Sequence, residues 1–210
     1  QLIVDLSHEL RTPVQILLNQ IEAILDGIHK ADAPRLEAMY AEITRTSELL
    51  NELEDRLIYE NDTFELNITP TDISEVARKV ALGHEGGFAQ KGLAFTSEIE
   101  PEIVIPADSI RFAQVLINLL SNAVKYTAEG YVSLSLQKAG DMVELLVADS
   151  GEGMAPDVVE NISKRSAQAF KAVNSKGVGL YIAKLIINKH GWQLHIDSAN
   201  NTGTRVRILM

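Results

Sequence analysis

The spacing of apolar residues changes once along the chain, and this change most constrains the fold. From Leu6 to Ile28, apolar residues recur at steps of three or four, a heptad-like stripe on one long helix. After "KADAP", where Asp32 can cap a helix and Pro34 suits its first turn, a second stripe begins. Its members are Leu36, Met39, Ile43, Leu50, Leu53 and Leu57. The two stripes predict a helical hairpin over residues 1–61.

Two helices alone leave part of both apolar stripes in water. Pairing two hairpins into a dimeric four-helix bundle buries them, so a homodimer is expected. The alternative is a hairpin that packs on the C-terminal domain of its own chain.

Residues 62–210 mix short strands with helices and predict a second domain. Two features predict its first helix: the stretch 71–84 reads as helical, and Thr71 is a plausible N-cap. Further helices are expected at 109–127 and 178–191, and strands at 64–70, 93–99, 102–106, 131–137, 142–149, 192–198 and 204–210. Because strands and helices do not strictly alternate, the fold class is α+β, with an α/β sandwich and a mixed or mainly antiparallel sheet.

Composition excludes several classes of function. The chain has 210 residues, 46% of them hydrophobic, which is enough for a real core. The absence of cysteine excludes disulfides, thiolate metal sites and a cysteine nucleophile. A net charge of −10 without any basic run argues against nucleic-acid binding, and no apolar run suggests a membrane span.

The segment "SHELRTP" places His8 on the first helix, on the side opposite the apolar stripe. Glu9 is beside it, Thr12 shares the exposed face, and Pro13 removes a helical N–H one turn away. A neutral imidazole is a good nucleophile, and a neighbouring carboxylate can accept its ring proton. An ordinary surface histidine is the simpler alternative.

The helix at 109–127 carries polar residues along one side. Asn118, Asn122 and Lys125 lie at i, i+4 and i+7, with Tyr126 next, while Val115, Leu116, Leu119, Leu120 and Ala123 supply the apolar side. An amide oxygen can hold hydrated magnesium and an ammonium can hold a phosphate. A solvent-exposed helix face would look the same.

Two glycine-bearing segments are candidate ligand loops. In "DSGEGM", Asp149 ends an apolar strand, and Gly151 and Gly153 permit a tight turn and close backbone approach. In "SKGVGL", Gly177 and Gly179 precede a helix whose N-terminus can receive phosphate. No G-x-x-x-x-G-K-[ST] sequence is present, so a nucleotide would not be bound as in P-loop proteins.

In this order, "SHELRTP", "NLLSNAVKYT", "DSGEGM" and "GVGLYIAK" resemble the catalytic core of bacterial sensor histidine kinases. The resemblance covers nearly the whole chain. It implies a dimerization and phosphotransfer hairpin at 1–61 and a Bergerat-type ATP-binding domain at 62–210, of the kind shared with gyrase, Hsp90 and MutL.

The resemblance also implies roles. His8 would accept the γ-phosphoryl group of ATP, Glu9 would polarise its ring, and Thr12 would place the water that dephosphorylates a response regulator. The residues implied to bind ATP are Asn118, Asn122 (with Mg²⁺), Lys125, Tyr126, Asp149, Gly151, Gly153, Gly177, Gly179, Leu180 and Thr204.

Two features bear on activity, a difference from the gyrase-like ATPases and a departure from the kinase family's own pattern. Asn118 stands where gyrase-like relatives have a water-activating glutamate, and because an amide is no general base, futile ATP hydrolysis should be slow. Between the two glycine segments only Phe170 stands for the family's aromatic segment, and Ser175 replaces a glycine, so the expected lid is short and atypical.

The resemblance therefore predicts ATP-dependent autophosphorylation and transfer to an aspartate of a response-regulator receiver domain, with regulator phosphatase activity as well. The alternatives are a molecule that is mainly a phosphatase and a nucleotide-sensing dimeric scaffold. The chain is expected to be the cytoplasmic part of a longer sensor that could be anchored in a membrane.

Overall fold

The computed structural model describes residues 2–43, 46, 64–163 and 178–210, and for residues 2–11 it describes the backbone. The chain divides into two compact units, residues 1–63 and 64–210. The predicted apolar positions Leu50, Leu53 and Leu57 lie outside the described residues, as do Phe170, Ser175 and Gly177.

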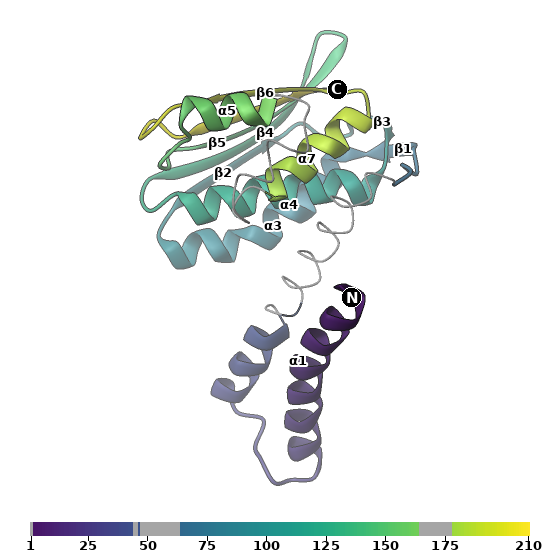
Figure 1. The fold of residues 1–210 in the computed structure, drawn as a ribbon, viewed down its shortest axis with the longest axis vertical. Helices are drawn as coiled ribbons and strands as arrows, with labels where there is room; N and C mark the ends of the chain where they lie inside the picture. The colour runs from purple at the N-terminus through teal and green to yellow at the C-terminus, as the bar shows by residue number, and fades with distance from the viewer. Residues whose placement is uncertain (1, 44–45, 47–63, 164–177) are drawn as a thin grey trace. The chain divides into compact units, whose positions relative to one another are not determined.

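The N-terminal unit contains two helical segments. Helix α1 spans Leu2–Leu25 and includes Pro13, whose side chain is buried (Figure 1). Residues 33–43 are also helical, and Asp32 caps their start, because its carboxylate accepts the backbone N–H of Arg35 at 3.1 Å. These two helical segments agree with the described part of the predicted hairpin, and the dimeric bundle stays a prediction.

Much of the predicted apolar stripe is exposed in the single chain. The side chains of Val14, Ile21 and Ile28 are 42% to 71% exposed, and Leu36 and Ile43 are about half exposed. Large apolar side chains that line one side of a hairpin and remain in water indicate a surface that another element covers.

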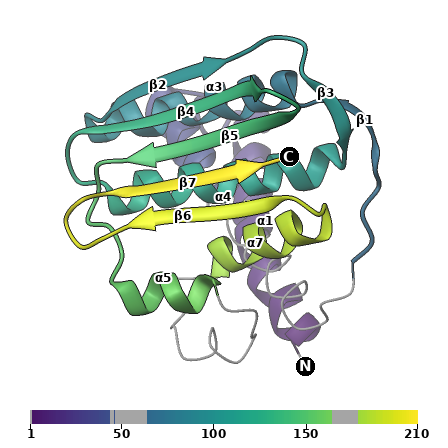
Figure 2. The same ribbon diagram turned by 90° about the horizontal axis from the view of Figure 1, so that it is seen from above.

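The C-terminal unit is built on a five-stranded mixed sheet (Figure 2). Its strands are β2 (Ala94–Ile99), β4 (Tyr131–Ala139), β5 (Met142–Asp149), β7 (Thr204–Leu209) and β6 (Gln193–Ser198), in that spatial order. Only the β2–β4 pair is parallel. The predicted α+β class with a mixed sheet is confirmed.

Three helices cover one face of this sheet: α3 (Ile73–Lys91), α4 (Ser109–Tyr126) and α7 (Val178–Lys189) (Figures 1 and 2). Alternate residues of β4 and β5 point into the core, and all five predicted apolar positions of α4 are buried. The strands bury every second residue and the helix buries one side, and these apolar side chains form one shared layer between sheet and helices. A short helix, α5 (Pro156–Ser163), lies beside β6.

Three sequence predictions need correction. Strand β1 is Thr69–Asp72, not 64–70, and pairs with β3 (Val104–Ala107) as a separate two-stranded ribbon. Asp72, not Thr71, is the N-cap of α3, because the Thr71 hydroxyl donates to the Ala107 carbonyl across the ribbon at 2.9 Å. Helix α3 also continues past His84 to Lys91, because Phe88 is buried and stacks on Phe95 at 4.3 Å.

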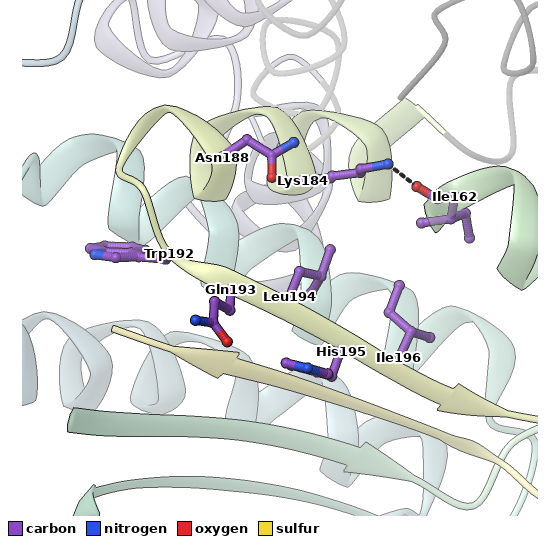
Figure 3. A pocket seen from close by; sticks show the side chains of 8 residues that line it. All are labelled: Ile162, Lys184, Asn188, Trp192, Gln193, Leu194, His195 and Ile196. Carbon is purple, nitrogen blue, oxygen red and sulfur yellow. Dashed lines mark hydrogen bonds between the residues drawn. The ribbon is translucent and has the colours of Figure 1, made fainter. Parts of the chain in front are cut away.

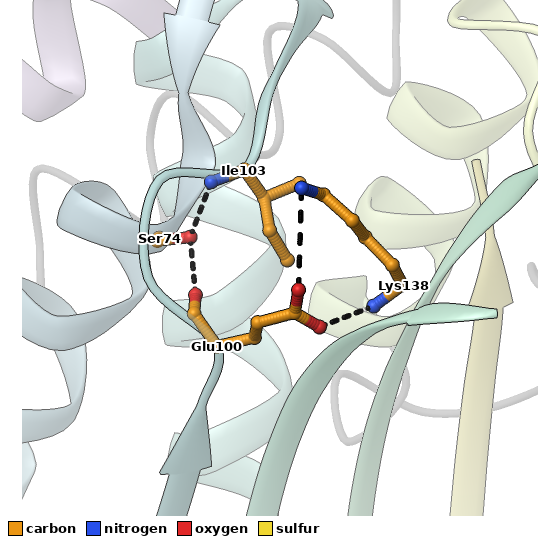
Figure 4. A network of polar contacts seen from close by, with 4 residues as sticks. All are labelled: Ser74, Glu100, Ile103 and Lys138. Atoms are coloured by element: carbon orange, nitrogen blue, oxygen red, sulfur yellow. Dashed lines mark hydrogen bonds and ion pairs between the residues drawn. The ribbon is translucent and has the colours of Figure 1, made fainter.

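A polar network fastens the start of α3 to the sheet (Figure 4). The buried Ser74 hydroxyl donates to the Glu100 carbonyl at 2.6 Å and accepts the Ile103 backbone N–H at 3.0 Å. The Glu100 carboxylate accepts the Lys138 backbone N–H at 2.8 Å. The network joins α3, the β2–β3 connection and β4.

Within the described residues, no helix is long and apolar enough to cross a membrane.

Candidate functional site

Asp149, at the end of β5, is held by the backbone around it. One carboxylate oxygen, Oδ1, accepts the N–H groups of Gly151 at 2.9 Å and Thr204 at 3.2 Å. Burial raises the pKa of Asp149, although both hydrogen bonds act to lower it. Because both bonds end on Oδ1, the second oxygen remains available to accept a hydrogen bond from a ligand.

Backbone and side-chain oxygens crowd the glycines of this corner. A Cβ on Gly151 would lie 2.5 Å from the Tyr126 carbonyl oxygen and 2.9 Å from Asp149 Oδ1. A Cβ on Gly153, whose φ is +65°, would lie 2.0 Å from the Ala199 carbonyl oxygen. Only glycine fits either position, so these residues build a wall of bare backbone beside Asp149.

The structure adds Gly203, which sequence reasoning missed. Its φ is +79°, and a Cβ there would lie 2.0 Å from the Asp149 carbonyl oxygen. The adjacent hydroxyls of Ser198 and Thr204 are 3.0 Å apart, and Ser198 also accepts the Met154 backbone N–H at 2.9 Å. The sequence "NTGT" offered a weak signal for this turn, but only the β5–β7 pairing, which sets Thr204 opposite Asp149, brings it to Asp149.

The polar side of α4 adjoins the start of α7. A Cβ on Gly179 would lie 3.3 Å from Asn118 Oδ1, so the first turn of α7 packs directly on the Asn118 amide. The Nδ2 atom of Asn118 is buried without a hydrogen-bond partner in the described part of the chain. Leu180, one residue further along α7, is buried. Two motifs far apart in sequence therefore meet here.

The C-terminal turn of α4 presents its remaining polar groups beside the corner. Asn122 is partly exposed, Lys125 is exposed, and the Lys125 ammonium lies 5.4 Å from the centre of the Tyr126 ring. The Tyr126 carbonyl accepts the Glu152 N–H at 3.1 Å, which ties this turn to the glycine loop. The last turn of α4 is thus bonded to the glycine loop through its backbone.

The hydrogen-bonding groups of this corner are of a kind that can hold a purine nucleotide. The cradle of bare glycines, the available Asp149 oxygen and the unpartnered Asn118 amide supply hydrogen-bonding groups without a basic pocket. No group of three or more His, Cys, Asp or Glu residues could hold a metal within the described ranges. An amide oxygen such as that of Asn122, together with phosphate oxygens of a ligand, could hold magnesium.

The predicted catalytic residues lie in the N-terminal unit, all on α1. His8 and Glu9 belong to the helical backbone, and the structure does not describe their side chains. Thr12, one turn after His8, is exposed.

A separate cavity of about 320 Å³ lies between α7, the end of α5 and β6 (Figure 3). Lys184, which is buried, donates to the Ile162 carbonyl beside it. Trp192 and His195 are also among its lining residues. None of the predicted nucleotide residues lines this cavity.

Comparison with known proteins identifies the fold of this corner. Residues 107–210 match the family described as "Histidine kinase-, DNA gyrase B-, and HSP90-like ATPase". The chain is 27% identical over 195 residues to the signal transduction histidine-protein kinase BaeS of Escherichia coli (strain K12). That match covers 90% of this chain and 42% of BaeS, so the chain spans less than half of this curated relative.

Solved structures agree over nearly the full chain. Full-length ShkA in complex with AMPPNP is 28% identical with a TM-score of 0.67, over 98% of this chain and 44% of ShkA. Histidine kinase ThkA, in complex with response regulator protein TrrA, shares the fold at 22% identity and a TM-score of 0.60, over 99% of this chain and 60% of ThkA. Residues 107–210 therefore belong to the histidine kinase-, DNA gyrase B- and HSP90-like ATPase family, within a catalytic domain of the bacterial sensor histidine kinase type.

Proposed function

We propose that the chain is the catalytic core of an ATP-dependent protein-histidine kinase that phosphorylates itself on His8. The observation that carries the proposal is the Asp149 corner, where two backbone amides fix one carboxylate oxygen and leave the other for the amino group of adenine. The complex of ShkA with AMPPNP supports the same ligand class.

The proposed reaction is an in-line phosphoryl transfer. Bound ATP with Mg²⁺ supplies the γ-phosphoryl group and the cation that neutralises its oxygens. Asn122 would hold the metal with Asn118 near it, Lys125 and Tyr126 would contact the phosphate and sugar region, and Gly179 would line the phosphate side at the start of α7. His8 would form the new P–N bond as the bond between the γ-phosphorus and ADP breaks, ADP would leave, and Glu9 would accept the ring proton of His8.

We further propose that phosphohistidine passes its phosphoryl group to an aspartate of a response-regulator receiver domain. The complex of ThkA with TrrA supports a partner of this class. Thr12 lies one turn from His8 with its side chain exposed, which favours a role for it in dephosphorylating the regulator. A Thr12→Ala variant should then keep autophosphorylation and lose phosphatase activity.

The exposed apolar side chains of the hairpin support a homodimer in which two copies form a four-helix bundle. Light scattering should give twice the chain mass at micromolar concentration. A monomer mass there would contradict the dimer. The proposed location is the cytoplasm, as part of a longer sensor.

The test of the kinase proposal is labelling with γ-phosphate-labelled ATP and magnesium. We expect an acid-labile, alkali-stable label on the native chain and on a His29→Gln control, which changes an exposed histidine after α1. His8→Gln should carry none. Equal labelling of His8→Gln, or no label on the native chain despite bound nucleotide, would contradict the proposal.

A further inference from the structure

Thr127 ends α4 and carries a hydroxyl with no assigned role. Its backbone N–H completes the helix by donating to the Ala123 carbonyl at 3.1 Å. Its side chain is fully buried, and Oγ1 has no hydrogen-bond partner in the described part of the chain. Leaving a buried hydroxyl without a hydrogen bond is unfavourable, so such groups usually serve a ligand, a water or a reaction.

The position of this hydroxyl points to the Asp149 corner. A Cβ on Gly151 would lie 2.9 Å from Thr127 Oγ1 and 2.9 Å from Asp149 Oδ1. The end of α4 and the end of β5 therefore each place one oxygen against the same glycine. Asp149 Oδ1 already accepts two backbone amides, whereas Thr127 Oγ1 makes no such bond in the described residues. The hydroxyl can both donate and accept.

We propose that Thr127 is a positioning residue for nucleobase recognition. Its hydroxyl gains its missing hydrogen bond when a 6-aminopurine nucleotide, or the water molecule that accompanies it, is held at Asp149. The inference rests on the proposed ATP site. It adds that Thr127, at the end of α4, helps Asp149, at the end of β5, to select a purine that carries a 6-amino group. The structural alternative is a hydroxyl that merely tolerates burial.

Two substitutions separate these readings. Thr127→Val keeps the shape and the extended backbone and removes the hydroxyl, so the chain without nucleotide should unfold at an equal or higher temperature. Thr127→Ser keeps the hydroxyl. Ser121→Ala is the matched control, because it removes an exposed hydroxyl from the same helix, 3.4 Å from His84.

The experiment is calorimetric titration of the full chain with AMPPNP and Mg²⁺, and with purine riboside triphosphate, which lacks the 6-amino group. We expect Thr127→Val to bind AMPPNP about tenfold more weakly than the native chain, equivalent to about 1.4 kcal/mol. Thr127→Ser and Ser121→Ala should stay within about twofold of the native chain. For purine riboside triphosphate, Thr127→Val and the native chain should bind with nearly the same affinity.

Three results would overturn the assignment. Unchanged AMPPNP binding by Thr127→Val would show that the hydroxyl serves no ligand. Equal losses for both nucleotides, with a lower unfolding temperature, would show a structural role. A native chain that binds neither nucleotide would overturn the proposed ATP site itself, and this inference with it.

Discussion

The backbone N–H of Asp108 donates a hydrogen bond to Nε2 of His190 at 3.1 Å, which joins the start of α4 to the end of α7. The other ring nitrogen, Nδ1, bonds the Ile186 carbonyl at 2.9 Å, so Nδ1 carries the proton and the ring is neutral. The ring also stacks on Trp192 at 4.0 Å. A neutral histidine thus links α4 and α7 at the ends away from Tyr126 and Gly179.

This link predicts a loss of stability in mild acid. Burial lowers the pKa of His190 below its ordinary value of 6.5, while the Ile186 bond and the Asp108 charge act to raise it. The unfolded chain therefore binds the proton more readily, and the unfolding free energy falls as the pH drops from about 8 through 6.5 toward the folded pKa. Urea denaturation followed by Trp192, the only tryptophan of the sequence, measures this slope.

Two histidine variants assign the slope. His190→Gln should flatten the pH profile, whereas His195→Gln, which changes an exposed residue of β6, should leave it as in the native chain. An unchanged profile in His190→Gln would mean that other groups cause the acid sensitivity.

Lys91 caps the C-terminal turn of α4 from outside that helix. Its ammonium donates to the carbonyls of Val124 at 2.6 Å and Thr127 at 3.3 Å, which interacts favourably with the helix dipole. Lys91→Met should lower the unfolding free energy by about 1 kcal/mol. Lys79→Met, which removes only an exposed ion pair with Glu75, should cost less than about 0.5 kcal/mol. Equal costs would refute the capping role.

The sequence anticipates elements whose signals are local. The apolar positions of α4 and the alternation in β4 and β5 are read directly from residue spacing, and the structure buries them as expected. Helix α3 extends beyond the predicted end at His84, because the packing of Phe88 on Phe95 outweighs the low helix propensity of Gly86 and Gly87. Tertiary contact here outweighs local propensity.

The sequence predicts the Asp149 corner only in part, and for the same reason. Asp149, Gly151 and Gly153 form one short motif that sequence alone can single out. Gly203 and Thr127 reach that motif through the β5–β7 register and the end of α4, which are non-local relationships. A family resemblance indicates which motif residues should lie close together. A buried polar atom without a hydrogen-bond partner, such as Thr127 Oγ1 among the described residues, is identified only in the structure.

Gly153 offers a test of how tightly the corner is built. Gly153→Ala would place a methyl group 2.0 Å from the Ala199 carbonyl oxygen at a positive φ, so the turn must move. Gly140→Ala is its matched control, with a φ of +66° and no atom within 4 Å of the new Cβ. The control should cost about 1–2 kcal/mol from backbone strain alone. Gly153→Ala should cost roughly 3 kcal/mol or more in chemical denaturation, and equal costs would show an open turn.

The buried charge of Asp149 should lower the free energy of unfolding, while its carboxylate is needed to bind the ligand. Burial raises its pKa above the ordinary 3.8, so the folded state holds its proton more tightly, and the charged form weakens the fold at pH values above the folded pKa. Asp149→Asn keeps an oxygen for the Gly151 and Thr204 amides and removes that charge. We expect the variant to lose AMPPNP binding, yet to unfold at an equal or higher urea concentration at neutral pH, with the gain vanishing below about pH 3.8. Asp141→Asn, at an exposed turn, should change neither property. A variant that loses binding because it unfolds more easily would instead make Asp149 a structural residue, whose carboxylate is needed to hold the loop rather than the ligand.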